Sequence, residues 1–272
     1  MSLECRSAVV NALYIYPIKS CKGVKVETVL MDSVGPVGDR RFMVVDDNGR
    51  FVTQRECPDM SAVEVGFQNG ELAIGLNGQV QCLVPLEGEG ERKLVSVWRD
   101  EVSAVDCGKE AAQWFSELLG KSCSLVRLDS DSNRQVDPVY SNGDAQVSFA
   151  DGFPLLVVNQ KSVDELSRRL GREVDVERFR PNVVVDADLP FEELNWMRLL
   201  QAGDSGGALE LVKPCERCVI PMRDLTTQKK EADMISLMKE ICLHDSKIIF
   251  GQNALATSIS SLKIGDQFEI QA

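Results

Sequence analysis

Three Asn-Gly pairs in the first third of this 272-residue chain constrain its fold more than any other feature. They are Asn48-Gly49, Asn69-Gly70 and Asn77-Gly78, and each lies between apolar segments, as in GFQNGELAIGLNGQVQCLV. Asn and Gly accept the positive φ angles that tight hairpin turns require. The pattern therefore predicts an antiparallel β-meander, and with it a β-rich N-terminal region.

A β-strand is predicted ahead of the meander, in the apolar stretch AVVNALYIYP. It ends at Pro17, because proline has no backbone N–H to donate to a strand ladder. The following IKSCKG is then a loop at the end of this strand. Lys19 and Ser20 thus stand where side chains can converge on a ligand.

Helices are predicted by apolar residues at helical spacing in GKEAAQWFSELLG, SVDELSRRLG and KKEADMISLMKEICL. Gly120 and Gly171 are suited to ending the first two, since many helices close on a residue in the left-handed conformation. Ser162 and Glu165 have the spacing of a capping box, so we expect the second helix to begin there. The neighbouring FPLLVVN predicts a buried strand, and LKIGDQFEIQA predicts a turn followed by a strand.

The polar segment 129–146, DSDSNRQVDPVYSNGDAQ, is the best candidate for a domain boundary or a mobile loop. With 44% hydrophobic residues, the chain can bury a core of ordinary size. We therefore expect a mixed α and β, β-rich protein with two β-rich barrels or sheets, formed by residues 1–127 and 128–272.

The net charge of −12 disfavours non-specific binding to nucleic acid or to anionic lipid, so any cationic site must be local. The N-terminus MSLECRSAVVNALYIYP lacks a basic start and an apolar run of about 18 residues, which export or membrane insertion needs. We expect a cytoplasmic protein without an integral membrane segment.

Two arginines at the margins of apolar strands, Arg40 and Arg180, are candidates for binding an anion, because a planar guanidinium clasps phosphate with two hydrogen bonds. Spacing alone favours ordinary surface or core-bridging arginines. Together with Lys19, Ser20 and Asn182, however, they can make a cradle for one phosphate-bearing ligand.

Nine cysteines without regular spacing do not suggest a secreted disulfide framework. The one C-x-x-C pair, Cys215 and Cys218, lies in PCERC, where Arg217 would lower the pKa of a neighbouring thiolate. A zinc site would lack further ligands, since His244 is the only histidine, and Pro221 opposes the helix that a thioredoxin-like pair begins. Two interpretations stay open: one thiolate ligates the metal of a cofactor, or both cysteines are inert and buried.

Five motifs in this order resemble proteins with a molybdenum cofactor sulfurase C-terminal (MOSC) domain: YPIKSCKG, DRRFMVVD, FADGFPLLVV, RFRPNVVVD, and CERC followed by DLTTQ. Within that superfamily the chain is most similar to the amidoxime-reducing component family, including its plant and bacterial relatives. The resemblance spans about residues 8–270. It implies a β-barrel-like MOSC N-terminal domain followed by a MOSC β-barrel with flanking helices.

The resemblance also implies a set of site residues. Cys218 would ligate molybdenum, and Asp151 would lie close to the metal. Cys215 would be structural, and Arg217 would orient the site. The side chains that would bind molybdopterin, the first three through its phosphate, are Lys19, Ser20, Arg40, Arg180 and Asn182.

Two features depart from the animal members of the family. Their hydroxyl residues after the aspartate are replaced here by Gly152 and Phe153, so only backbone donors can make that phosphate contact. Their membrane-anchoring leader is also absent, so association with the mitochondrial outer membrane is not encoded in this sequence.

The implied activity is that of an oxidoreductase, a molybdenum cofactor-dependent reductase of N-hydroxylated compounds such as amidoximes, hydroxylamines and N-hydroxylated bases. Cytochrome b5 and cytochrome b5 reductase would supply the electrons, and we expect a monomer. Asp151 is the candidate for orienting substrate or relaying a proton, against a simple turn-forming role before Gly152. The alternatives are a sulfur carrier that uses a cysteine persulfide and a non-catalytic molybdopterin-binding protein.

Overall fold

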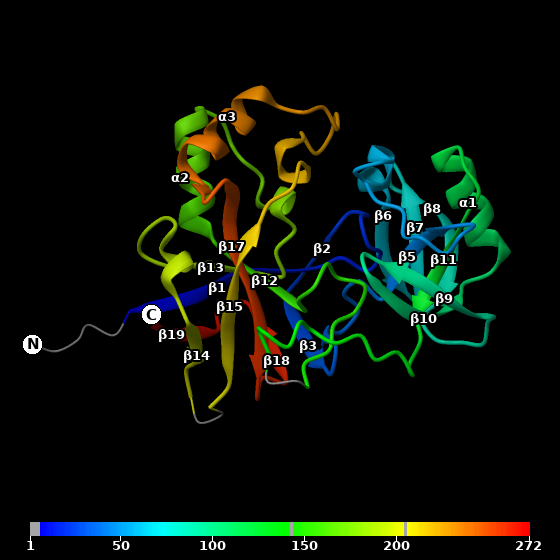
Figure 1. Cartoon of the computed structure of the whole chain (residues 1–272), viewed down its shortest axis with the longest axis horizontal. Helices are drawn as coiled ribbons and strands as arrows, with labels where there is room; N and C mark the ends of the chain where they lie inside the picture. The colour runs from blue at the N-terminus through cyan, green and yellow to red at the C-terminus, as the bar shows by residue number, and fades with distance from the viewer. Residues whose placement is uncertain (1–5, 142–143, 204–205) are drawn as a thin grey trace, which may run out of the picture.

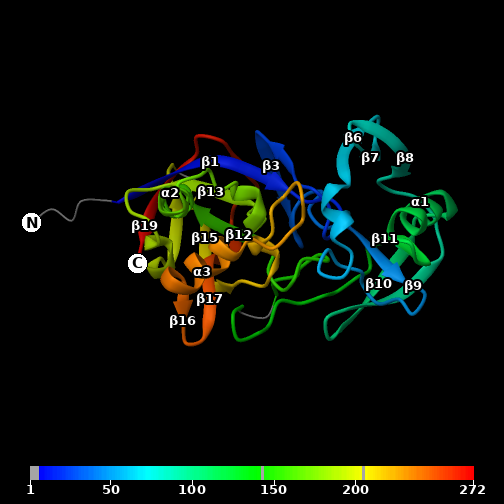
Figure 2. The same ribbon diagram turned by 90° about the horizontal axis from the view of Figure 1, so that it is seen from above.

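The computed structural model describes residues 6–141, 144–203 and 206–272, which form two β-rich lobes (Figure 1). The mixed, β-rich fold predicted from the sequence is confirmed. The view from above shows the helix α1 at the far end of one lobe and α2 and α3 on the other (Figure 2). These helices are α1 (Lys109–Leu119), α2 (Gln160–Leu170) and α3 (Ala232–Ile241).

The larger lobe is a closed barrel of seven strands in the order β12-β13-β1-β19-β14-β15-β17, and β17 pairs back with β12. The short strands β2 and β16 extend it through β1 and β17. Their bounds are β1 (Ser7–Ile15), β2 (Val24–Val26), β12 (Leu155–Asn159), β13 (Val183–Asp186), β14 (Arg198–Gln201), β15 (Ala208–Glu216), β16 (Leu243–His244), β17 (Lys247–Thr257) and β19 (Gln267–Gln271).

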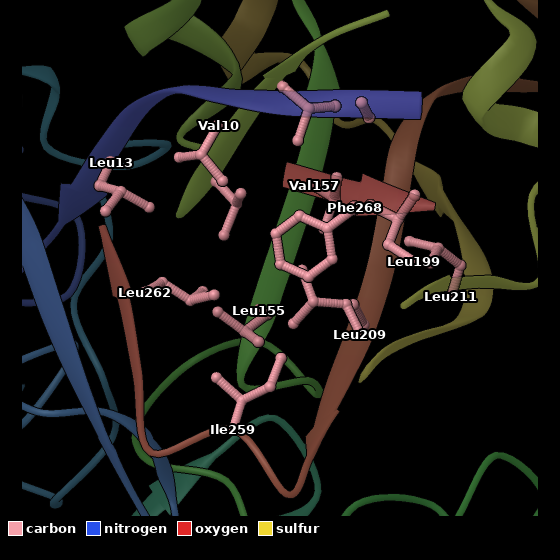
Figure 3. Close-up of a cluster of buried hydrophobic side chains, with 14 of the residues drawn as sticks. Val10, Leu13, Leu155, Val157, Leu199, Leu209, Leu211, Ile259, Leu262 and Phe268 are labelled. Carbon is pink, nitrogen blue, oxygen red and sulfur yellow. The ribbon is translucent and has the colours of Figure 1, made fainter. Parts of the chain in front are cut away.

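The barrel interior is filled by side chains that alternate along its strands. Along β1, Ala8, Val10 and the apolar residues that follow are buried, while Ser7 and Val9 face outward, as strand geometry requires. Figure 3 shows Val10 and Leu13 of β1 around the same interior as Val157 of β12 and Phe268 of β19. The first and last strands of the chain thus share one core.

The smaller lobe consists of the sheets β5-β11-β10-β9 and β6-β7-β8 with α1 packed against them. Two of the Asn-Gly pairs turn the predicted hairpins, with φ angles of 52° at both Asn69 and Asn77. The strands are β5 (Phe42–Asp46), β6 (Glu64–Gln68), β7 (Glu71–Leu76), β8 (Gln79–Pro85), β9 (Arg92–Val97), β10 (Asp100–Asp106) and β11 (Cys123–Leu128).

A further small sheet has the order β18-β3-β4. Its strands are β3 (Thr28–Asp32), β4 (Gly35–Pro36) and β18 (Ser261–Lys263). Short 3-10 helices lie at Pro58–Ala62, Val176–Phe179, Glu192–Asn195 and Ile220–Met222.

The predicted helices are confirmed, but one predicted helix start is wrong. Helix α2 begins at Gln160 and is capped by Asn159, whose side chain accepts a hydrogen bond from the backbone N–H of Lys161. Ser162 lies inside the helix, where its hydroxyl donates to the buried carboxylate of Glu193 at 2.8 Å. A distant partner, rather than the local capping box, therefore determines the role of this serine.

The predicted division into residues 1–127 and 128–272 stays a prediction. The strand β1 pairs with β13 and β19, so the start of the chain belongs to the barrel sheet. The segment 129–146 is irregular over its described part and carries an isolated bridge between Gln135 and Gln146. None of the helices in the described residues is long and apolar enough to cross a membrane.

Candidate functional site

One pocket gathers all seven side chains that the sequence singled out, although they come from five separate segments. Residues of both lobes line it, since Thr53 and Gln54 belong to the smaller lobe and Asn253 to β17 of the barrel. The predicted residues at this pocket are Lys19, Ser20, Arg40, Asp151, Arg180, Asn182 and Cys218.

The inner end of the pocket is cationic. The guanidinium carbons of Arg40 and Arg180 lie 4.3 Å and 4.2 Å from the ring centroid of Tyr16, whose side chain is fully buried. Arg40 is neutralised by an ion pair of 2.7 Å with the buried Asp39. Among the described residues, no carboxylate lies within 4.0 Å of Arg180, which donates to the carbonyl of Cys21 at 2.6 Å. This end therefore carries a positive charge without a matching anion.

The surroundings of Arg180 destabilise its charged form. Burial, together with repulsion from the Arg40 guanidinium, lowers the pKa of Arg180 to about 10. An anion bound between the two arginines would attract both and so offset that repulsion, because opposite charges stabilise each other most where water is excluded.

Three of the residues around this end have an unusual backbone. Ser20, Arg40 and Arg180 have φ angles of 73°, 46° and 57°, in the left-handed region that residues with a Cβ seldom adopt. Such strained positions concentrate at functional sites, where the surrounding structure holds them in place. The backbone of Arg40 is held by hydrogen bonds with Tyr16 and Phe149.

Asn182 fixes the geometry of the inner end through its side-chain amide. Its oxygen accepts from Arg40 at 3.0 Å and from the backbone N–H of Leu156 at 3.2 Å. Its nitrogen donates to the carbonyl of Tyr14 at 3.2 Å. Asn182 thereby ties the first arginine to two strands of the barrel.

Lys19 and Asp151 form an ion pair nearer the mouth of the pocket. The ammonium of Lys19 is buried and lies 2.5 Å from the Asp151 carboxylate and 2.7 Å from the carbonyl of Phe149. The protein atoms around the partly exposed Asp151 carboxyl would alone raise its pKa, but the Lys19 ammonium, Arg55 and the Trp98 indole hold that pKa well below its usual range. Burial lowers the pKa of Lys19, and Asp151 opposes that shift.

The two cysteines of the C-x-x-C pair have different partners. Cys218 is exposed at the pocket, and its sulfur lies 3.4 Å from a guanidinium nitrogen of Arg55 and 3.5 Å from the backbone nitrogen of Ile220. Cys215 is partly buried, and its sulfur accepts from Arg217 at 3.0 Å. The cation beside the exposed sulfur is thus Arg55, whereas Arg217 serves the other cysteine.

Sequence reasoning missed three residues at this site: Arg55, Trp98 and Arg134. Trp98 offered a signal, because a bulky aromatic residue is out of place in a two-residue turn between two strands. Arg55 and Arg134 carried no local signal, since their partners lie elsewhere in the sequence.

Arg134 is a buried clamp beneath Asp151. Its side chain is 4% exposed, and its guanidinium donates to the carbonyls of Ser148, Ala150 and Asp151 and to the carboxylate of Asp100. One arginine from the polar segment 129–146 therefore satisfies the carbonyls of the loop that presents Asp151 to the pocket. Unpaired carbonyls at that depth would be costly.

Comparison with known proteins agrees with this architecture. Residues 7–122 match the family described as the MOSC N-terminal beta barrel domain, and residues 144–269 match the MOSC domain. The fold and the paired matches define the class: the chain belongs to the MOSC-domain proteins that carry the N-terminal barrel module.

Within that class, its relatives include the amidoxime reducing components. It is 31% identical to the mitochondrial amidoxime reducing component 2 of Bos taurus, over 94% of this chain and 81% of that protein. It is 30% identical to the mitochondrial amidoxime-reducing component 1 of Mus musculus, over 94% and 80%. A molybdenum cofactor sulfurase of Bos taurus is 27% identical over 94% of this chain but only 31% of its own length.

Proposed function

We propose that the protein is a molybdenum cofactor-dependent reductase of N-hydroxylated compounds, with Cys218 as the protein ligand of the metal. The observation that carries the proposal is the convergence of one exposed cysteine sulfur with a partly buried pair of arginines in one pocket. Thiolates are soft ligands suited to metals such as molybdenum, and arginines are suited to phosphate. The amidoxime reducing relatives support the same assignment.

The residues of the pocket fit a cofactor that has an anionic tail and a metal at its other end. Arg180 lines the pocket and lacks a carboxylate partner among the described residues. The Nε atom of Arg217 is buried and unpaired within the described part of the chain. These donors face a ligand of the opposite character, one with oxygen acceptors and negative charge.

Under this proposal Arg40, Arg180 and Ser20 would hold the phosphate of molybdopterin, and Asn182 would keep Arg40 in place. Lys19, which the resemblance also assigns to the phosphate, is instead ion-paired with Asp151. When bound, the molybdenum cofactor supplies two-electron reduction and a metal that accepts oxygen from the N–O group.

Asp151 and Lys19 divide the proton chemistry. Because its pKa is held low, the Asp151 carboxylate is ionised at neutral pH and can accept a hydrogen bond from a substrate N–H or O–H. The proton of the pair resides on Lys19 Nζ, whose pKa is lowered by burial and which is therefore the better proton donor. In this proposal Asp151 orients the substrate, and Lys19 carries the proton.

The electrons come from an external donor of the cytochrome b5 type, with cytochrome b5 reductase behind it. The acidic surface of this chain, with a net charge of −12, limits docking of an acidic donor to a local basic patch or to a weak contact.

The test is elemental analysis and benzamidoxime reduction for wild type, Cys218→Ser and Cys215→Ser, expressed in a host that makes molybdopterin. We expect molybdenum and activity in wild type, and loss of activity with loss of the metal in Cys218→Ser. Cys215→Ser is the matched control, because the Cys215 sulfur contacts Arg217. If Cys215→Ser loses activity and Cys218→Ser keeps it, the ligand assignment is wrong.

A second candidate function is a sulfur carrier in which Cys218 bears a persulfide. The exposure of its sulfur and the molybdenum cofactor sulfurase relatives favour this alternative. A carrier would contain labile sulfur that cyanide releases, without molybdenum. A protein that binds molybdopterin without turnover would instead contain molybdenum and show no reduction of N-hydroxylated compounds.

A further inference from the structure

Trp98 occupies a turn position that its side chain does not suit. It follows β9 and, with Arg99, forms the two-residue connection to β10, since Val97 pairs with Asp100. Its φ angle is 57°, whereas the comparable hairpins of this lobe place Asn69 and Asn77 at that conformation. A bulky residue with positive φ is a true outlier, and such strain is tolerated where a function requires the side chain.

The Trp98 ring lies beside two residues that line the pocket, Asp151 and Arg55. Its indole N–H donates to Asp151 at 3.2 Å, and its ring packs against Phe51 with centroids 5.1 Å apart. Half of the side chain, 50%, remains exposed. Phe51 thus supports the ring, and the other half of the residue is open to solvent or to another group.

The Arg55 guanidinium lies over the Trp98 ring. Its central carbon is 5.0 Å from the ring centroid, and the group is 3.9 Å from the Asp151 carboxylate. The same group reaches the Cys218 sulfur at 3.4 Å. A planar cation with an N–C–N core therefore sits between an aromatic face, a carboxylate and the cysteine sulfur.

We propose that Trp98 and Asp151 form a subsite for a planar amidine-type group, the head of an amidoxime or N-hydroxyguanidine, and that Arg55 fills this subsite until such a group displaces it. The proposal rests on the proposed function and adds to it the side chains that select the substrate. Trp98 is the stacking surface, and Arg55 is a competing internal occupant.

The guanidinium that is displaced and the groups that displace it have the same planar shape. An amidoxime has the planar N–C–N core of the Arg55 guanidinium, and the amidine formed on its reduction is a cation. Both can stack on an indole, as the arginine does, and both can donate hydrogen bonds to a carboxylate, which the arginine approaches to 3.9 Å. While Arg55 occupies the subsite, no ligand can bind there. The apparent affinity for a ligand is therefore reduced in proportion to the fraction of the protein in which the subsite is free.

The first experiment measures benzamidine binding to the molybdenum-loaded protein by calorimetry in wild type, Trp98→Asn and Arg55→Gln. Asn suits the turn, so Trp98→Asn removes the ring and keeps the hairpin. We expect Trp98→Asn to weaken benzamidine binding about 10-fold. Arg55→Gln should tighten it about threefold or more by removing the competitor. Unchanged binding in Trp98→Asn, or weaker binding in Arg55→Gln, would overturn the subsite.

The second experiment compares kcat/KM for benzamidoxime with that for N-methylhydroxylamine, which has no planar head. We expect Trp98→Asn to lower the ratio of the two about 10-fold, and the matched turn variant Arg99→Gln to leave the ratio unchanged. An equal loss for both substrates would overturn the stacking role. Wild-type protein without molybdenum or without N-hydroxy reduction would instead refute the proposed function, so the two failures are distinguishable.

Discussion

The inner end and the mouth of the pocket are built in opposite ways. At the inner end, Arg40, Asn182 and Tyr16 are enclosed, and each arginine is tied to a backbone carbonyl or a buried carboxylate. At the mouth, Cys218 is exposed, and the Asp151 side chain is 64% exposed. The difference indicates a division of labour: a preorganised end that anchors a ligand, and an accessible end where groups exchange.

The largest expected effect comes from breaking the inner end. Arg180→Ala removes the arginine that has no carboxylate partner among the described residues and leaves Arg40, which is already neutralised by Asp39, so we expect molybdopterin affinity to fall by about 2–3 kcal/mol, roughly 30- to 150-fold. Molybdenum and pterin content of the purified protein measure the loss. Arg172→Ala, which removes an arginine ion-paired to Glu231 and Asp233 outside the pocket, should retain both. Full cofactor content in Arg180→Ala would show that this end is not an anchor.

The clamp between the two ends gives the next largest effect. Arg134→Met leaves three carbonyls without their donor, and we expect the free energy of unfolding to fall by about 2 kcal/mol. Urea unfolding measures this loss. Arg134→Lys should recover part of it, because one ammonium can still reach some of the carbonyls. A loss below about 0.5 kcal/mol, typical of a surface residue, would contradict the assigned role.

Acidic pH tests the contribution of Asp151 at the mouth of the pocket. The pKa of the Asp151 carboxyl is depressed in the folded protein, so its contribution to stability is present above the unfolded pKa of about 4 and is lost as the pH falls further. We therefore expect the difference in unfolding free energy between wild type and Asp151→Asn to be constant near neutral pH and to shrink below about pH 4. Chemical unfolding across this range measures the difference. A gap that widens in acid would mean that the carboxyl is not stabilised in its charged form.

The smallest effect isolates the backbone strain at Trp98. Trp98→Asn and Trp98→Ala both remove the ring, but only Asn readily adopts a positive φ angle. We expect Trp98→Asn to be more stable than Trp98→Ala by about 1 kcal/mol, measured by urea unfolding. Equal stabilities would indicate that the turn carries no strain.

The two ends also differ in how far the sequence could predict them. Lys19, Arg40, Arg180 and Asn182 each lie in a short motif, and the order of these motifs indicated that they meet. Arg55 is 163 residues from Cys218 in the chain and touches it only through the tertiary fold. No periodicity or spacing encodes a contact of that kind.

The same limit, that sequence patterns do not reveal distant partners, explains why the predicted start of helix α2 was wrong. Local chemistry correctly predicted the turns at Asn69 and Asn77 and the helix ends at Gly120 and Gly171, because these depend on the φ angle of one residue. Ser162 is different, since its hydroxyl is claimed by Glu193, 31 residues away. Where a tertiary partner competes with a local one, sequence patterns favour the local partner.

The pairing of β1 with β19 joins the first strand of the chain to its last. During synthesis the barrel lacks one strand until the ribosome has released residues 267–271. The smaller lobe, whose strands all lie within residues 42–128, can assemble sooner. Because both lobes line the pocket, a ligand that needs the whole pocket can bind only after residues 267–271 have been made and have closed the barrel.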